Sequence, residues 1–304
     1  MKNIKNSRLL KSLSSVQDWA RDEHPRTPKR FDEYMSNQGF IALAANDLFR
    51  LGMREIKTSL NTATAHKFLS TKHMAHGVAR MLVSDAINIE VLKGENTTAV
   101  SNLDDATELM LGAIATGQPH LVKPFHQAVF SGIEGGYGIS DGHDLPIGTT
   151  LRYAAFGLTI IGDWLGKPLD LDKHALPRDP AWGQLVAYWR EPDPVKLLPI
   201  LLNACDTHVE RIALKDSELN TGLFEFGSVF QAVYPTEILA ILRLRDLIGL
   251  PNPPWIGHPL MQSPYAALTC RPGMITERDE LLNRFLETAY QRDPQCVPPS
   301  LTAG

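Results

Sequence analysis

The segment of residues 234–261 contains the most continuous apolar helical pattern of the chain. Pro235 suits the first turn of a helix, and Gly249 followed by Pro251 is a typical helix ending. Apolar residues cover almost every side of this predicted helix, which indicates a helix surrounded by other helices. They are Ile238, Leu239, Ile241, Leu242, Leu244, Leu247 and Ile248. Arg245 would face the same apolar surface, so the pattern predicts a partner for its charge.

Further helical patterns follow one another along the chain, and they predict an all-α fold. Apolar residues recur at spacings of three and four in residues 8–23, for example, and again in residues 276–290. No fixed repeat length is present, so we expect an irregular multi-helix bundle or stack of about ten helices. At most one short β-hairpin is predicted, near residues 87–100, because residues 87–92 are rich in β-branched side chains and Lys93-Gly94 follows them.

A glycine-rich stretch is the best candidate for a boundary within the chain. Six glycines lie in residues 132–148, more than in any comparable stretch. This pattern predicts an N-terminal helical half of residues 1–131, a connection of residues 132–148 and a C-terminal helical half of residues 149–304. The two halves either fold separately or form one continuous domain.

The composition argues against several classes of partner. The net charge of −4 gives no reason to expect nucleic acid as a partner, because phosphate binding requires clustered Lys and Arg. No stretch reaches the roughly 18 apolar residues of a membrane span, and the first residues lack the apolar run of a signal peptide. Cys205, Cys270 and Cys296 match neither a disulfide framework nor a zinc pattern. We therefore expect a cytoplasmic protein with reduced thiols, without membrane or nucleic-acid partners.

Residues 138–142 match the G-x-S-x-G pattern of a hydrolase nucleophile elbow, with Ser140 in the position of the nucleophile. An elbow requires an apolar strand before the serine and a helix after it, and neither pattern is present. His143 is also too close in sequence to reach Ser140 as a triad histidine. A polar, glycine-rich loop is the favoured interpretation, and a helical hydrolase that uses the loop of residues 132–144 remains the alternative.

Three histidines could share one helix face, since His66, His73 and His76 are separated by seven and three residues. A metal site would need carboxylate or cysteine ligands at a matching spacing, and no H-E-x-x-H motif occurs. Surface or capping histidines are the favoured interpretation. We therefore predict no catalytic residues, no metal and no cofactor.

The residues most suited to binding a partner are acidic or aromatic. The acidic residues are either a solvated surface or a patch that docks a basic partner. The tryptophans lie on one short predicted helix, where core packing and a surface hot spot are both possible. The candidate partner-binding residues are Asp104, Asp105, Glu108, Asp141, Asp144, Trp182 and Trp189.

Three segments of the second half carry a family resemblance: residues 182–194 (WGQLVAYWREPDP), residues 197–212 (LLPILLNACDTHVERI) and residues 249–261 (GLPNPPWIGHPLM). In composition and position they resemble the helical immunity proteins of bacterial polymorphic-toxin and type VI secretion systems. Such proteins have no catalytic activity and neutralise a cognate toxin, often a nuclease or another hydrolase. The resemblance thus implies a toxin partner and no enzyme, and it assigns no residue roles. A helical adaptor or oligomer subunit is a further hypothesis.

Overall fold

The computed structural model describes residues 6–21, 28–92, 103–134, 152–173, 176–219, 221, 223–298 and 301. Helices dominate these residues, which contain no β-strand beyond one isolated backbone bridge between Ile212 and Phe226. The predicted all-α fold is therefore confirmed. No helix in this described part of the chain is long and apolar enough to cross a membrane.

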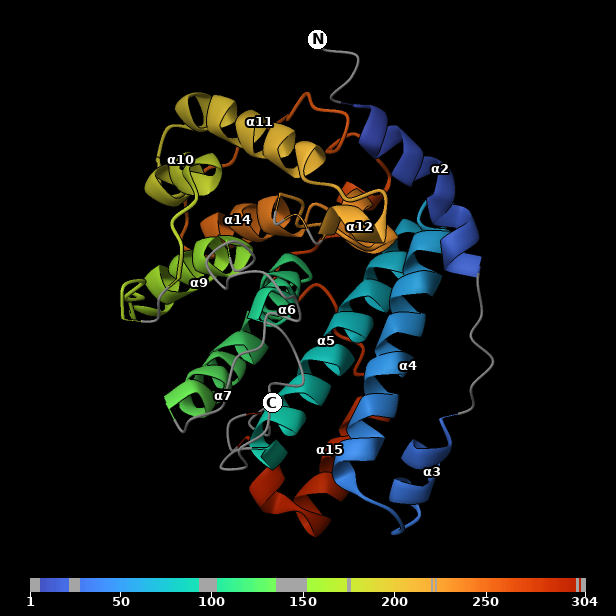
Figure 1. Cartoon of the computed structure of the whole chain (residues 1–304). Coiled ribbons are helices and arrows are strands. Elements are labelled where there is room, and N and C mark those ends of the chain that lie inside the picture. Colours follow the sequence, from blue (N-terminus) through green and yellow to red (C-terminus); the bar gives the residue numbers. More distant parts are fainter. Residues whose placement is uncertain are drawn as a thin grey trace.

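The helices form an irregular bundle, with α10 and α11 at one end and α3 and α15 at the other (Figure 1). Their bounds are α2 Ser7–Arg21, α3 Lys29–Met35, α4 Ile41–Thr62, α5 Lys67–Leu92, α6 Leu103–Ala115, α7 Val122–Glu134, α9 Arg152–Leu165, α10 Pro180–Tyr188, α11 Pro194–Glu210, α12 Asp216–Leu219, α13 Val229–Val233, α14 Thr236–Leu247 and α15 Glu280–Arg292. Short 3-10 helices occur at Pro119–Leu121, Tyr265–Ala267 and Pro294–Cys296.

Helices α4 and α5 form the longest pair, and they run side by side in opposite directions (Figure 1). Two glycines lie where their backbones come closest. A Cβ atom on Gly52 would lie 2.6 Å from the carbonyl oxygen of Gly77, and one on Gly77 would lie 2.7 Å from that of Gly52. Glycine is therefore required on both helices for this close approach. Gly39 has a different role. It lies in the connection between α3 and α4, where its φ of +70° is a conformation that glycine adopts readily.

The predicted strand at residues 87–92 is wrong, since these residues form the last turns of α5. Ile87, Asn88 and Ile89 are buried there, and residues 90–92 are partly buried. A helix that is covered on most sides can contain β-branched residues throughout, because burial outweighs their small loss of helix propensity. The remainder of the predicted hairpin, residues 93–100, lies outside the described residues.

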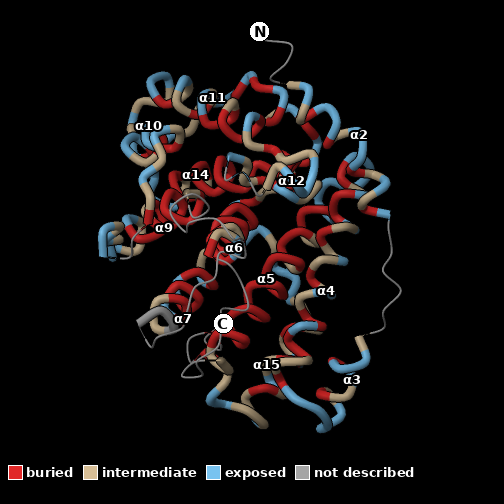
Figure 2. The backbone as a smooth tube through the Cα atoms, viewed as in Figure 1, coloured by how far each residue is buried: buried red, intermediate tan, exposed pale blue. Residues whose placement is uncertain are grey.

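Helix α14 is the buried central helix that the sequence predicts. All but one of its first ten residues are buried, and Figure 2 shows the buried residues concentrated in α14, α6 and α5. The predicted ending is also present: Gly249 has a φ of +74°, and the amide of Leu250 donates to the carbonyl of Arg245 at 2.9 Å. This is the hydrogen bond of a Schellman motif, which satisfies a carbonyl at the helix end.

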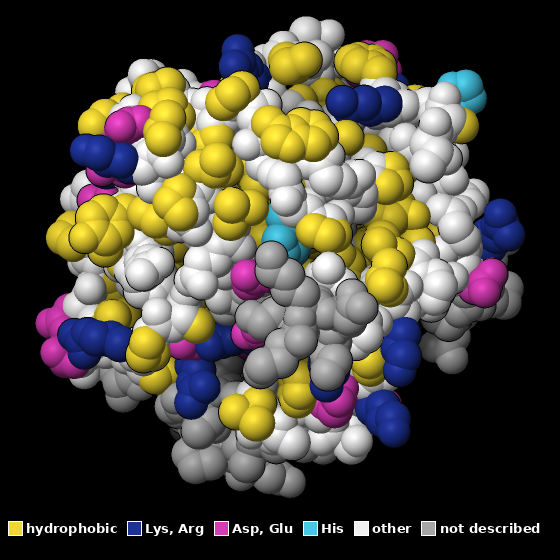
Figure 3. Space-filling view, turned by 90° about the horizontal axis from the view of Figure 1, so that it is seen from above, with side chains coloured by type: hydrophobic (Ala, Val, Ile, Leu, Met, Phe, Trp, Pro, Cys, Tyr) yellow, Lys and Arg dark blue, Asp and Glu magenta, His cyan; other side chains and the backbone are white. Residues whose placement is uncertain are grey.

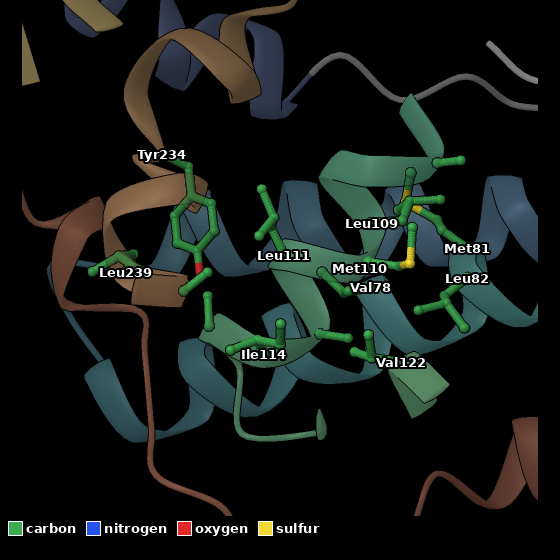
Figure 4. Packing of buried hydrophobic residues seen from close by; sticks show 14 of the residues in the cluster. Val78, Met81, Leu82, Leu109, Met110, Leu111, Ile114, Val122, Tyr234 and Leu239 are labelled. Carbon is green, nitrogen blue, oxygen red and sulfur yellow. The ribbon is translucent and has the colours of Figure 1, made fainter. Parts of the chain in front are cut away.

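One hydrophobic cluster joins residues from both predicted halves of the chain. Figure 4 shows Val78 from α5 and Leu111 from α6 in the same packed region as Leu239 from α14. At the far end, the ring of Phe285 on α15 lies 5.6 Å from that of Phe31 on α3. The last helix thus packs on one of the first. Most of the predicted connection, residues 132–148, lies outside the described residues.

Candidate functional site

The two tryptophans predicted to bind a partner are both in the core. Trp182 is 1% exposed and Trp189 is 2% exposed. The indole of Trp182 stacks on Phe156, and the indole N–H of Trp189 donates to Asp163 at 2.8 Å. Core packing describes these rings, because an interface role requires a ring that a partner can reach. In this structure both rings therefore have the core-packing role, which was one of the two roles that the sequence left open.

The predicted acidic residues do different jobs. A carboxylate oxygen of Asp104 accepts a hydrogen bond from the amide of Ala154 at 2.7 Å, so Asp104 caps the first turn of α9 from another helix. Glu108 is partly buried and accepts a hydrogen bond from Gln231; burial raises its pKa to about 8. Asp105 is exposed. Asp141 and Asp144 lie outside the described residues, as do Ser140 and His143.

The three histidines have separate surroundings. His66 is exposed, the Nδ1 of His73 lies 2.5 Å from Glu55, and the Nε2 of His76 lies 3.3 Å from the carbonyl of Glu277. Among the described residues, no three His, Cys, Asp or Glu side chains are placed to hold a metal ion together.

The most exposed tryptophan in the described part of the second half is one that the sequence analysis did not select. Trp255 is 65% exposed, and it follows Pro253 and Pro254 in the segment after α14. The proline rings fix φ and stiffen the segment. A tryptophan directly after a Pro-Pro pair, outside any helical pattern, is the signal that could have identified it.

Arg245 holds the beginning of this segment from inside the core. Its guanidinium is fully buried and donates to the carbonyl oxygens of Trp189 and Pro251, at 2.6 and 2.5 Å. Its Nε donates to the side-chain oxygen of Asn252 at 3.0 Å, and Asn252 in turn donates to the carbonyl of Leu242. Burial lowers the pKa of Arg245, although nearby acidic groups act against this. The predicted partners of Arg245 are therefore mainly backbone carbonyls that fix the loop.

The other end of the segment is also held. The Nε2 of His258 lies 3.4 Å from Asp206 on α11, and burial lowers the pKa of this histidine. Gln262 donates from its side chain to the carbonyl of Ile256 at 2.7 Å. Trp255 is thus exposed on a segment whose backbone accepts a hydrogen bond from the buried Arg245 on one side, at Pro251, and from Gln262 on the other, at Ile256.

Further apolar side chains are exposed on residues that neighbour this support in the sequence. Tyr188 immediately precedes Trp189, whose carbonyl accepts a hydrogen bond from Arg245. Leu247 is the last residue of α14, and Ile248 directly follows it. We refer to Tyr188, Leu247, Ile248 and Trp255 as the Trp255 surface. Seen from the end of the molecule that α10 and α11 cover, hydrophobic side chains gather in several patches (Figure 3).

The arrangement suits contact with another molecule. A large aromatic ring on a fixed backbone loses little freedom on binding, so most of its buried area contributes to affinity. No family model, no curated protein and no solved structure matches this chain.

Proposed function

We propose that this chain is a non-catalytic immunity protein that binds and neutralises a cognate secreted bacterial toxin in the cytoplasm. The observation that supports a binding role is Trp255, exposed on a segment that Arg245 and His258 hold in place. Tryptophan and tyrosine dominate the residues that carry the binding energy of interfaces. The toxin as the class of partner comes from the resemblance of residues 249–261 and the two earlier segments.

The contact in this proposal is mainly aromatic and apolar. Asp104 already caps α9 and Glu108 already binds Gln231, so these acidic groups serve the packing between helices. The toxin would present an apolar pocket that takes the indole of Trp255. Charged groups around such a pocket would affect the rate of association more than the affinity.

Calorimetric titration of the purified protein with the product of a neighbouring toxin gene tests the proposal. We expect a complex with a Kd below about 1 μM, and we expect Trp255→Ala to weaken it by about thirtyfold or more, as for a hot-spot tryptophan. The matched control is Phe40→Ala, because Phe40 is 76% exposed just before α4 and takes no part in the contacts that hold the segment of Trp255, so it should leave the affinity unchanged.

Two outcomes would contradict this proposal. The first is the absence of any complex at micromolar concentrations of both proteins. The second is equal binding to many unrelated proteins through the Trp255 surface, which would instead favour an adaptor.

A further inference from the structure

A carboxylate lies in the core at the beginning of α14. Glu237 is fully buried, and its Oε1 lies 2.8 Å from the Nδ1 of His208, which is fully buried on α11. The imidazole of His208 stacks on Phe226 with the ring centres 4.0 Å apart. Two titratable side chains are therefore packed together without contact with solvent.

The number of protons on this pair follows from which of the neighbouring atoms can only accept a hydrogen bond. The Nε2 of His208 lies 3.3 Å from the carbonyl oxygen of Ala232 on α13, and a carbonyl can only accept. One proton must therefore be on Nε2. A second proton must lie between Nδ1 and the carboxylate oxygen, because two bare acceptors at 2.8 Å would repel each other. The pair then has no net charge, whether it is imidazolium with carboxylate or imidazole with carboxylic acid.

The surroundings of the pair would penalise a net negative charge. The other oxygen of Glu237 and the hydroxyl of Tyr153 on α9 are both buried and have no hydrogen-bond partner among the described residues. The charge of Glu237 also contributes to raising the pKa of Tyr153 and of Glu108 on α6. The titratable groups that interact with the charge of Glu237 or His208 are Glu108, Tyr153, Cys205 and His258. Next to these groups, Asp206 lies beside His258, and Glu225, which pairs with Arg211, acts on Tyr153.

We propose that His208 and Glu237 form a proton-dependent junction, which holds two protons when α11, α13 and α14 are closed on one another and releases one when they separate. In the open state above the ordinary pKa of histidine, about 6.5, the imidazole keeps one proton and the exposed carboxylate keeps none. Each opening therefore releases one proton. By linkage, the opening equilibrium constant rises about tenfold for each unit of pH.

Hydrogen exchange of backbone amides in these three helices measures this slope between about pH 6.5 and about pH 8.5. The measurement uses Glu108→Gln as the parent, because burial raises the pKa of Glu108 to about 8 and that group would otherwise release a proton in the same range. In the closed state Cys205 and Tyr153 stay protonated over this range, since burial raises the pKa of both above the ordinary value. In the open state an exposed cysteine loses its proton only near the upper end of the range, and it does so equally in the parent and in the control variant.

The matched control is Glu237→Gln in the same parent. A glutamine amide can donate to Nδ1 while Nε2–H still donates to Ala232, so this variant holds a neutral imidazole in both states. In the parent, we expect the opening equilibrium constant to rise about tenfold for each unit by which the pH is raised. In the variant, we expect it to be independent of pH. A flat parent, or equal slopes in both proteins, would overturn the proposal.

Nitrogen-15 NMR of the histidine ring gives a second readout that needs no variant of the pair. We expect a slowly exchanging proton on Nε2 and a strongly downfield proton shared between Nδ1 and Glu237. A His208 ring with Nε2 unprotonated would contradict the proton count, whatever the exchange data show.

Discussion

Glu108 illustrates how much a single carboxyl group can cost at the interface between helices. Its folded pKa of about 8, raised mainly by burial, is above the ordinary value of 4.5, so folding is penalised increasingly as the pH rises through this range. Glu108→Gln retains an acceptor for Gln231 and removes the penalty. We expect urea unfolding to show about 2 kcal/mol of added stability at pH 8 and little change at pH 4. Asp105→Asn, on the exposed side of the same helix, should show a much smaller gain at pH 8; an equal gain would contradict this account.

Arg245 connects the core to the Trp255 surface. Arg245→Lys keeps the charge, but an ammonium group cannot reach the carbonyls of Trp189 and Pro251 and the side chain of Asn252 with the same geometry. We expect a loss of about 2–4 kcal/mol in denaturant unfolding, because buried acceptors are left unpaired. Arg271→Lys is the control, since Arg271 is largely exposed, and a comparable loss there would refute the explanation.

For single residues, the sequence predicted which side chains need a partner but not which groups provide it. The need of Arg245 for a partner follows from its place in an apolar pattern, but the carbonyls that meet it belong to residues brought there by the fold. The sequence also did not show that Trp189 is buried while Trp255 is exposed. For a helix as short as α10, the sequence is compatible with more than one choice of the buried face. The exposure of Trp255 depends on how the fold holds its loop.

The contact between α4 and α5 makes a prediction for a whole element. Gly52→Ala should raise the intrinsic helix propensity of α4 by about 1 kcal/mol, yet the new methyl group would meet the backbone of Gly77 at 2.6 Å. We expect a net loss of about 2–4 kcal/mol in thermal or urea unfolding, because backbone atoms cannot move aside cheaply.

A glycine in open surroundings provides the matched control. Gly183 lies in α10, and a Cβ atom there would meet nothing within 4 Å. Gly183→Ala should therefore stabilise the protein by about 0.5–1 kcal/mol. If both substitutions changed stability in the same direction, the close contact would not be the cause.

Helix positions were the most predictable part of the fold, because apolar spacing indicates them directly. The end of α5 is an exception: residues 87–92 contain three β-branched side chains, so their composition predicted a strand, although they form the buried and partly buried end of a helix. Similarly, the sequence alone could not show that Gly39 lies between two helices while Gly52 lies within one. The distinction depends on the neighbouring helix.

For the whole molecule, acid should destabilise the fold through histidines that are buried in the neutral form. Burial, with a smaller effect of Lys167, lowers the pKa of His126 to about 4, and burial also lowers that of His120 and His258. The unfolded chain therefore binds more protons below about pH 6.5, and stability falls as the pH falls. Between pH 7 and pH 4.5, we expect the free energy of unfolding of His126→Gln, measured with urea, to fall by about 2 kcal/mol less than that of the wild type. Parallel pH profiles would contradict this assignment.

Long-range packing was the least predictable property of the whole molecule. Phe31 and Phe285 come from opposite ends of the chain, and each is simply one apolar residue on an amphipathic helix. Their pairing depends on the positions of all the helices between them. The same holds for the His208–Glu237 pair, whose members each look like an ordinary helix residue in the sequence.

Two of the three groups that Arg245 binds are main-chain carbonyls, and every amino acid has one. The side chains of residues 253–255 take no part in those bonds. Substitutions at these positions can therefore change the exposed surface of the loop while its support stays intact. Under the proposed function, a lineage that meets a succession of different toxins could diversify the tip of this loop, provided that the guanidinium beneath it is retained.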